Sequence, residues 1–215
     1  MAGRFITFEG PDGSGKSTHL KRAAEWFRHR GVAVVCSREP GGTPLGQAVR
    51  QLFLDAPWEQ PDGGVEALLV FAARRQHLAE VIEPALAQDR WVLCDRYTDS
   101  TFAYQGAGRG EPIERLRALD RWATGGRLPD RTLLFDLPAE AARARSHSDR
   151  RLAEAGKVNR LDVEDLAFYE RVRACYLELA AAEPARFRII DSGGSVAETS
   201  AQVEIALGDV AAVSA

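Results

Sequence analysis

The chain has 215 residues, 45% of them hydrophobic, which is enough for one sizeable core and predicts a single domain. Its formal net charge of −3 excludes a general nucleic-acid binder, because such a protein needs a broad basic surface. No apolar run approaches the length that crosses a bilayer, and a strand begins too close to the N-terminus to leave room for a signal peptide. A cytoplasmic protein with no membrane partner is therefore expected. Cys36, Cys94 and Cys175 lie far apart in the sequence and indicate buried thiols of a reducing compartment.

Apolar runs alternate with helical periodicities along the chain. The runs predict five strands, at residues 5–8, 32–36, 91–94, 132–136 and 187–191, the second of them buried on both faces. The periodicities predict helices at residues 17–30, 45–54, 65–87, 99–105, 112–122, from 139 onward, 163–181 and 196–207, with a loop at 106–110. This alternation predicts an α/β fold, in which a five-stranded parallel sheet carries helices on both faces.

The first strand runs directly into a glycine-rich loop with the spacing Gly-x-x-x-x-Gly-Lys-Ser. The glycines let successive backbone N–H groups point inward at the start of a helix, which makes an anion-binding nest. Lys16 is expected to reach the β- and γ-phosphates of ATP, and a glycine turn before an ordinary helix is the alternative interpretation. The predicted phosphate-binding residues are Gly10, Pro11, Asp12, Gly13, Ser14, Gly15, Lys16, Ser17 and Thr18.

Two oxygen-bearing side chains suit a magnesium ion, the predicted cofactor. Asp95 ends the third strand, where P-loop proteins hold Mg²⁺ directly or through water, and the Ser17 hydroxyl is the second expected ligand. Arg96 follows at once and is expected to point its guanidinium into the same cleft. An ordinary aspartate at the end of a strand and a surface arginine are the alternatives.

Two predicted helices carry groups that suit a nucleotide base and its phosphate. Phe71 and Arg74 are three residues apart and share a helix face, so a ring could stack on a base while a guanidinium holds a phosphate. Core packing of Phe71 is the alternative. A second face presents hydroxyls and a carboxamide that can read a base edge, unless it is simply an exposed helix end. It consists of Ser100, Thr101, Tyr104 and Gln105.

Residues 143–160 carry six basic side chains and two acidic ones. A charge run on its own is usually a solvated face, but beside a triphosphate site it can form a small basic lid whose arginines neutralise charge. Arg150 and Arg151 are the expected catalytic arginines of this lid. The other catalytic residues expected from these motifs are Lys16 and Arg96.

These motifs, in their order and spacing, resemble bacterial thymidylate kinases over nearly the whole chain. The resemblance rests on residues 8–18, 38–43, 71–74, 95–97, 99–106 and 168–173. The pieces at 38–43 and 95–105 separate this family from most other P-loop kinases. With a glycine at position 13, the chain resembles the members of the family in which the lid, and not the phosphate loop, supplies an additional arginine. Both 149–151 and 159–162 partly match the lid pattern of the family, so which arginine reaches the phosphates stays open.

The resemblance implies a P-loop NTPase fold and transfer of the γ-phosphoryl group of MgATP to dTMP, which yields dTDP and ADP. It implies that Asp12 is a further catalytic residue, which contacts the sugar 3′-hydroxyl. It also implies that Arg74 and Arg96 hold the substrate phosphate and that Tyr104 disfavours a ribose 2′-hydroxyl. A homodimer is expected on the same ground. In some relatives the aromatic that stacks on thymine lies one residue earlier, where this chain has Val70, so whether Val70 or Phe71 faces thymine stays open. The expected dTMP contacts are Asp12, Glu39, Phe71, Arg74, Arg96, Ser100, Thr101, Tyr104 and Gln105.

Two rival functions remain open. A deoxynucleoside kinase shares the phosphate loop and the Asp95-Arg96 pair, but it would need a carboxylate base, for which Glu39 is the candidate, and it leaves Arg74 unexplained. A nucleotide-dependent switch would bind a partner without phosphorylating an acceptor. Its GTP-binding form needs Asn-Lys-x-Asp, which residues 159–162 do not match.

Overall fold

A computed structural model describes residues 2–54, 62–153 and 164–212 of the chain. Five strands form one parallel sheet in the order β2-β3-β1-β4-β5. Their bounds are β1 (Phe5–Glu9), β2 (Val34–Arg38), β3 (Trp91–Asp95), β4 (Arg131–Asp136) and β5 (Phe187–Asp191). The predicted five-stranded parallel sheet is thus confirmed.

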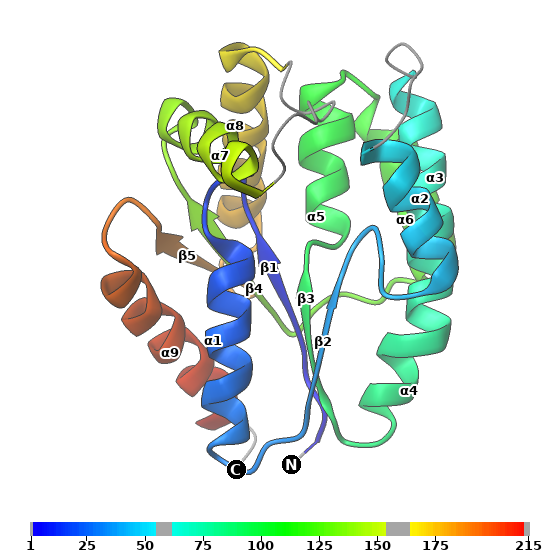
Figure 1. Ribbon diagram of the computed structural model, residues 1–215. Helices are drawn as coiled ribbons and strands as arrows, with labels where there is room; N and C mark the ends of the chain where they lie inside the picture. The colour runs from blue at the N-terminus through cyan, green and yellow to red at the C-terminus, as the bar shows by residue number, and fades with distance from the viewer. Residues whose placement is uncertain (1, 55–61, 154–163, 213–215) are drawn as a thin grey trace.

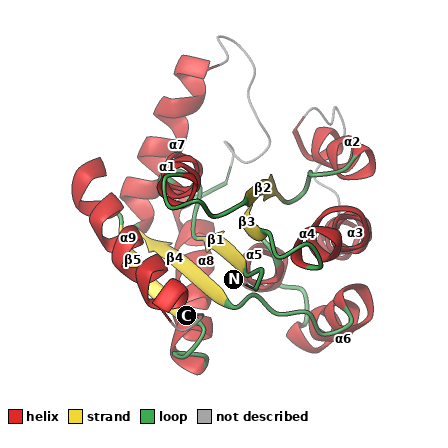
Figure 2. Ribbon diagram, turned by 90° about the horizontal axis from the view of Figure 1, so that it is seen from below, coloured by secondary structure: helices red, strands yellow, loops and turns green. Residues whose placement is uncertain are grey.

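Helices cover both faces of this sheet (Figures 1 and 2). In chain order the α-helices of the described ranges are α1 (Lys16–Arg28), α2 (Pro44–Leu54), α3 (Gly63–His77), α4 (Glu83–Leu86), α5 (Thr98–Thr101), α6 (Ile113–Thr124), α7 (Ala139–Ala153), α8 (Leu166–Ala182) and α9 (Val196–Ala212). Two π-helical segments, η1 (Leu78–Ile82) and η2 (Phe102–Gly108), join α3 to α4 and extend α5. No helix in these ranges is both long and apolar enough to span a bilayer.

The core is divided by the sheet, because successive side chains of a strand point to opposite faces. Ile6 and Phe8 face α1 and α9, where they pack with residues such as Phe27 and Leu207. On the other face, Phe5 packs with residues of β3, η1 and α4, while β4 and β5 pack against α8. Burial on both faces therefore applies to β1, β3 and most of β4.

The second strand differs from its prediction. β2 is only partly buried because it lies at the edge of the sheet, with β3 as its one neighbour. Cys36 is consequently exposed, whereas Cys94 on β3 is buried and Cys175 on α8 is partly buried. The prediction of three buried thiols is wrong for Cys36, because an apolar run does not reveal whether a strand has a neighbour on each side.

The predicted loop at residues 106–110 also differs. Helical structure continues through η2 to Gly108, and the chain leaves it only at Arg109. Gly108 lies close against α8, since a Cβ there would be 2.5 Å from the Phe168 ring. The absence of a side chain at Gly108 therefore permits this close packing against α8.

Candidate active site

The phosphate loop connects β1 to α1. Gly10, Gly13 and Gly15 all adopt positive φ angles, of 135°, 79° and 84°. At Gly10 a side chain is also excluded sterically, because a Cβ would lie 2.4 Å from the carbonyl oxygen of Phe135 on β4. Backbone N–H groups at the start of α1 lack helical partners and attract anions. The loop thus has the backbone shape that a phosphate nest requires.

Lys16 is buried at the base of this loop. Its ammonium group donates to the carbonyl oxygen of Pro11 at 2.7 Å and lies 3.4 Å from the Ser14 hydroxyl. Burial, with a smaller contribution from Arg96, lowers the pKa of Lys16 to about 8. A phosphate bound here would offset the desolvation of the buried ammonium, because it places a negative charge beside it.

Ser17 and Asp95 meet as predicted for a magnesium site. The Ser17 hydroxyl donates to Asp95 Oδ2 at 2.6 Å, and Asp95 Oδ1 is buried without a hydrogen-bond partner among the described residues. Hard oxygen ligands of this kind fit Mg²⁺, which usually takes one or two carboxylates together with phosphate oxygens. The described part of the chain has no group of three or more His, Cys, Asp or Glu side chains that could hold a metal by themselves.

Arg96 lies beyond Asp95 in a left-handed backbone conformation, with a φ of 73°. Its Nη2 donates to Asp12 Oδ1 at 2.8 Å and to the Tyr104 hydroxyl at 3.0 Å. Its Nη1 donates to the hydroxyls of Ser100 and Tyr176, at 3.0 and 3.2 Å. Four partners from four segments therefore fix this guanidinium, and strained backbone of this kind is typical of functional sites.

A buried carboxyl group, Glu9, contacts two of the hydroxyl groups that bind Arg96. Ser100 and Tyr176 donate their hydroxyls to Glu9 Oε2, at 2.5 and 2.9 Å, and the backbone N–H of Tyr97 donates to Oε1. Burial first, and the charge of Asp99 second, raise the pKa of Glu9 to about 7. Glu9 and Tyr176 were not predicted as site residues, although an acid at the end of a largely apolar strand was a usable signal.

Arg74 on α3 belongs to a second buried chain of contacts. Its Nε donates to Glu39 Oε2 at 2.6 Å, while His77 Nδ1 lies 2.8 Å from Glu39 Oε1 and His77 Nε2 lies 2.6 Å from the Ser37 hydroxyl. Arg74 and Glu39 are 1% and 3% exposed. Burial lowers the pKa of Arg74, but Glu39 outweighs it, and the net shift is upward.

The two terminal nitrogens of the Arg74 guanidinium differ in their contacts. Nη2 donates to the Tyr97 carbonyl and to the Thr101 hydroxyl, whereas Nη1 is buried with no hydrogen-bond partner in the part of the chain that is described. A buried donor without a partner is costly, so this nitrogen of a cavity-lining arginine is a candidate to bind an acceptor atom of a ligand.

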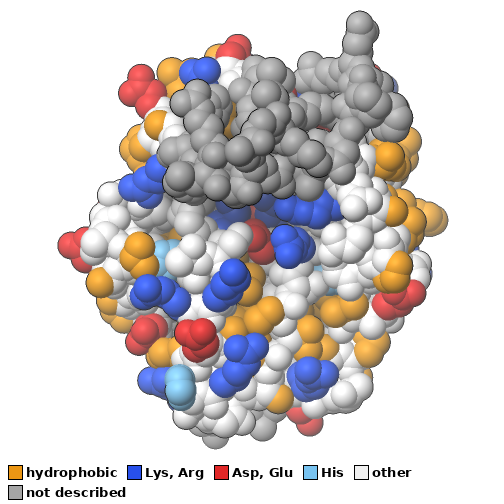
Figure 3. All heavy atoms as spheres, viewed as in Figure 1, with side chains coloured by type: hydrophobic (Ala, Val, Ile, Leu, Met, Phe, Trp, Pro, Cys, Tyr) orange, Lys and Arg blue, Asp and Glu red, His pale blue; other side chains and the backbone are white. Residues whose placement is uncertain are grey.

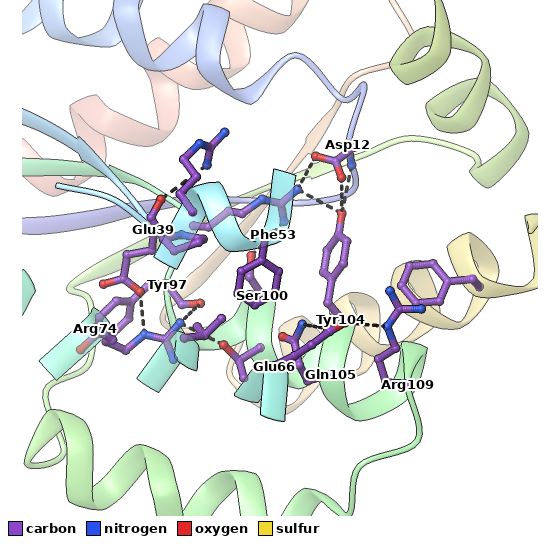
Figure 4. A pocket seen from close by; sticks show the side chains of 16 residues that line it. Asp12, Glu39, Phe53, Glu66, Arg74, Tyr97, Ser100, Tyr104, Gln105 and Arg109 are labelled. Carbon is purple, nitrogen blue, oxygen red and sulfur yellow. Dashed lines mark hydrogen bonds and ion pairs between the residues drawn. The ribbon is translucent and has the colours of Figure 1, made fainter. Parts of the chain in front are cut away.

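A cavity of about 210 Å³ brings most of the predicted acceptor residues together (Figure 4). These are Asp12, Glu39, Arg74, Arg96, Ser100, Thr101, Tyr104 and Gln105. The structure does not bring Phe71 to this wall: Phe71 is 2% exposed and packs with Ala67, Phe102, Leu116 and Ala123. Val70, Phe53 and Phe168 supply apolar lining instead.

The end of this cavity that lies against α3 holds a charged group, Glu66, that was not predicted from the sequence. Gln105 Nε2 donates to Glu66 Oε2 at 2.9 Å, and Arg109 Nε lies 3.4 Å from Glu66 Oε1. Glu66, Arg74 and His77 are all buried and all lie on α3. Their spacing puts these three polar residues on one face of a helix, and that was the signal available in the sequence.

A second cavity, of about 220 Å³, lies over the phosphate loop. Among the predicted phosphate-binding residues, Asp12, Gly13, Gly15, Lys16, Ser17 and Thr18 line it. Gly10, Pro11 and Ser14 shape the loop from behind. The two cavities share four lining residues, Asp12, Glu39, Arg50 and Arg96. A donor phosphate in one and an acceptor in the other would therefore meet beside two arginines, of which Arg50 was not predicted.

The predicted lid begins in α7, which passes above the connection between β1 and α1 (Figure 1). A Cβ on Gly13 would be 2.3 Å from the carbonyl oxygen of Ala142. Arg145 anchors this helix by donating to the carbonyl of Ser192 at 2.9 Å. The side chains of Arg150 and Arg151, and residues 154–163 as a whole, lie outside the described part, so the lid arginines stay predictions.

Comparison with known proteins places these features in context. Residues 8–203 match the family model described as thymidylate kinase. The chain is 51% identical to the thymidylate kinase of Cupriavidus metallidurans over 212 residues, which cover 99% of each protein. It is 49% identical to that of Pseudomonas syringae pv. tomato over 204 residues, 95% of this chain and 94% of the relative. The crystal structure of thymidylate kinase from Ehrlichia chaffeensis superposes with a TM-score of 0.78 at 33% identity, covering 97% of this chain and 99% of that one.

Proposed function

Because the chain belongs to the thymidylate kinase family, we propose that it transfers the γ-phosphoryl group of ATP to dTMP, with dTDP and ADP as products. The observation that carries this proposal is the junction of the two cavities. A cavity over a phosphate loop meets a second one with apolar walls, and Arg50 and Arg96 stand where they join. This adjacency supports direct transfer between two bound nucleotides.

On the donor side, the backbone N–H groups of residues 13–17 and the Lys16 ammonium bind the β- and γ-phosphates of ATP. Ser17 and Asp95 hold Mg²⁺, which supplies neutralisation of the charge on the transferred group. The unpartnered Asp95 Oδ1 supports this assignment. Burial keeps Lys16 close to the phosphates and excludes water from the contact, which strengthens the attraction.

On the acceptor side, Arg50 and Arg96 bind the phosphate of dTMP, since both line the junction. A phosphate monoester oxygen is already an anionic nucleophile at neutral pH, so the reaction needs no general base. The work of these arginines is to hold that oxygen in line with the γ-phosphorus and to neutralise the developing charge. Asp12, held by Arg96 and Tyr104, is placed for the sugar hydroxyl.

Arg74 lines the acceptor cavity but not the cavity over the phosphate loop, and it lies on the opposite side of the acceptor cavity from Asp12 (Figure 4). We therefore assign Arg74 to a carbonyl oxygen of the base, which differs from the phosphate role expected from the resemblance. Val70, Phe53 and Phe168, and not Phe71, enclose the ring on this assignment. The base end and the phosphate end of the acceptor are thus read by different arginines.

A deoxynucleoside kinase is disfavoured by the surroundings of Glu39. Both oxygens of this carboxylate are engaged, one by Arg74 and one by His77, and the side chain is buried. A general base must reach the proton of a neutral hydroxyl, which an occupied ion pair does not do. A switch protein is disfavoured because it would have no use for a second cavity beside the phosphates.

A homodimer also belongs to the proposed function. Val65 and Leu68 on α3 and Trp122 on α6 are 46%, 56% and 76% exposed, and the two helices pack side by side. Hydrophobic side chains are visible at the right-hand edge of the molecule in Figure 3, on the side where α2 and α3 lie in Figure 1. Exposed apolar stripes of this kind mark association surfaces.

The experiment that tests the proposed activity is ADP release from MgATP with a panel of acceptors: dTMP, dUMP, AMP, CMP, GMP and thymidine. Turnover with dTMP well above the others is the expected result. Turnover with thymidine alone would move the assignment to a nucleoside kinase. Hydrolysis that does not depend on any acceptor would support a switch.

A further inference from the structure

A buried acid at the acceptor cavity, Glu66, has no part in the phosphoryl transfer described above. It lies in the first turn of α3 with 3% of its side chain exposed, and it lines the cavity. A carboxylate is rarely buried unless a charge partner and hydrogen bonds stabilise it. Its contacts therefore indicate what it does.

Arg109 and Gln105 are the contacts that matter. Arg109 Nε lies 3.4 Å from Glu66 Oε1, while Arg109 Nη1 lies 2.6 Å from Glu164 and its guanidinium stacks 4.9 Å from the Phe168 ring centre. Glu66 is thus the carboxylate of an ion pair with Arg109. An ionised carboxylate has no proton to give, so every hydrogen bond that it makes must be donated by its partner.

The carboxylate of Glu66 fixes the orientation of the Gln105 carboxamide. Its NH₂ end must face Glu66, as the 2.9 Å contact from Nε2 to Oε2 shows (Figure 4). The opposite orientation would set the amide oxygen against a carboxylate oxygen, and two acceptors repel. Glu66 therefore fixes which end of the Gln105 amide turns toward the carboxylate, and leaves the amide oxygen as an acceptor for a ligand.

Arg74 Nη1 supplies the complementary donor, because it is buried in the wall of the same cavity and has no partner among the described residues. An acceptor and a donor together match one class of pyrimidine. Thymine and uracil offer an N3–H donor and an O4 acceptor, whereas cytosine offers the reverse, an N3 lone pair and a 4-amino donor. Cytosine would thus face an acceptor with an acceptor and a donor with a donor.

We propose that Glu66 is a positioning residue that orients the Gln105 carboxamide and thereby makes the acceptor site select a pyrimidine with an N3–H over cytosine. The inference rests on the proposed function, since it concerns which nucleoside monophosphate that site accepts. Glu66 acts through its contact with Gln105, so its effect is on specificity.

The test compares wild type with Glu66→Gln, using dTMP and dCMP as acceptors. A neutral amide at position 66 can donate or accept a hydrogen bond, so the Gln105 carboxamide can rotate and exchange the positions of its oxygen and its NH₂ group. The ratio of kcat/KM for dTMP to that for dCMP should fall at least tenfold, mainly through KM, while the KM for ATP stays within about twofold. An unchanged ratio would overturn the proposal.

Two further variants separate positioning from general damage. In a Gln105→Ala background, Glu66→Gln should change the ratio by no more than about twofold, because the group through which it acts is gone. Glu164→Gln removes the other acid from Arg109 and should leave the ratio unchanged. An undiminished effect of Glu66→Gln in the Gln105→Ala background would overturn the proposal.

If Glu66→Gln does not fold, Glu66→Asp serves instead, because it keeps the charge opposite Arg109 but withdraws the acceptor from Gln105. The same ratio should then fall at least threefold, and an unchanged ratio would again overturn the proposal. Failure of the proposed function gives a different result: wild type itself would not turn over dTMP.

Discussion

At the residue scale, Glu9 couples the stability of the protein to pH. Its pKa is raised from 4.5 to about 7, mainly by burial, so between these values the folded state holds a proton that the unfolded state has released. The free energy of unfolding therefore falls as the pH rises through this window, by up to about 3 kcal/mol from this one group. Below pH 4.5 both states are protonated and the effect disappears.

Glu9→Gln tests this coupling because glutamine cannot ionise. Urea unfolding at pH 5, 6, 7 and 8 should show that the variant gains stability relative to wild type as the pH rises, by up to about 3 kcal/mol. The comparison removes contributions from other groups, since both proteins share them. A difference that does not vary with pH would mean that Glu9 ionises in the folded state as it does in the unfolded one.

Arg74 tests the acceptor site at the same scale. Arg74→Ala should raise the KM for dTMP at least tenfold and leave the KM for ATP within about twofold, because Arg74 lines only the acceptor cavity. Steady-state kinetics measure both constants, and a thermal melt checks that the unpaired Glu39 has not unfolded the variant. Arg75→Ala is the matched control, since this exposed neighbour donates to the Ala123 carbonyl outside the site. Equal effects on both substrates would remove Arg74 from the acceptor site.

At the element scale, the contact between the phosphate loop and α7 decides how closely the start of the predicted lid approaches the nucleotide. Gly13 and Gly31 have nearly the same φ, 79° and 73°, but very different surroundings. A Cβ on Gly13 would meet the Ala142 carbonyl at 2.3 Å, whereas a Cβ on Gly31 would meet nothing within 4 Å. The two positions therefore separate backbone strain from steric clash.

Gly31→Ala should lose about 1 kcal/mol of unfolding free energy, the cost of a left-handed conformation with a side chain. Gly13→Ala should lose roughly 1–3 kcal/mol more and raise the KM for ATP, because α7 must move off the loop. Denaturant unfolding and ATP kinetics on the two variants measure these effects. Equal losses would show that α7 does not press on the loop in solution.

At the scale of the whole molecule, the exposed apolar stripe on α3 and α6 predicts self-association. Sedimentation of the wild type should give twice the mass of the chain. Leu68→Arg combined with Trp122→Arg should shift it toward the monomer, because a charge in an apolar interface has no partner. Ile205→Arg is the control: Ile205 is 69% exposed but lies on α9, on the opposite side of the molecule (Figure 1). A wild-type monomer would remove the proposed homodimer.

Much of the fold was predictable because its signals are local. Runs of apolar residues placed all five strands to within two residues, and the spacing of glycines placed the phosphate nest. The carboxyl ends of parallel strands meet at one edge of the sheet, and there Glu39 and Asp95 line the cavity over the phosphate loop. The errors, at Cys36 and at residues 106–108, arose where a neighbour distant in sequence decides burial or helix packing.

The sequence by itself determined that this protein has a parallel sheet with a phosphate loop and belongs near the thymidylate kinases, since backbone geometry and residue order carry that information. Only the tertiary structure decided which side chains face the acceptor. It placed Phe71 in the core, brought Arg50 and Phe168 to the cavity from distant segments, and buried Glu9, Glu66 and His77 beside their partners. These roles depend on contacts between residues far apart in the chain, and spacing along a sequence does not specify such contacts.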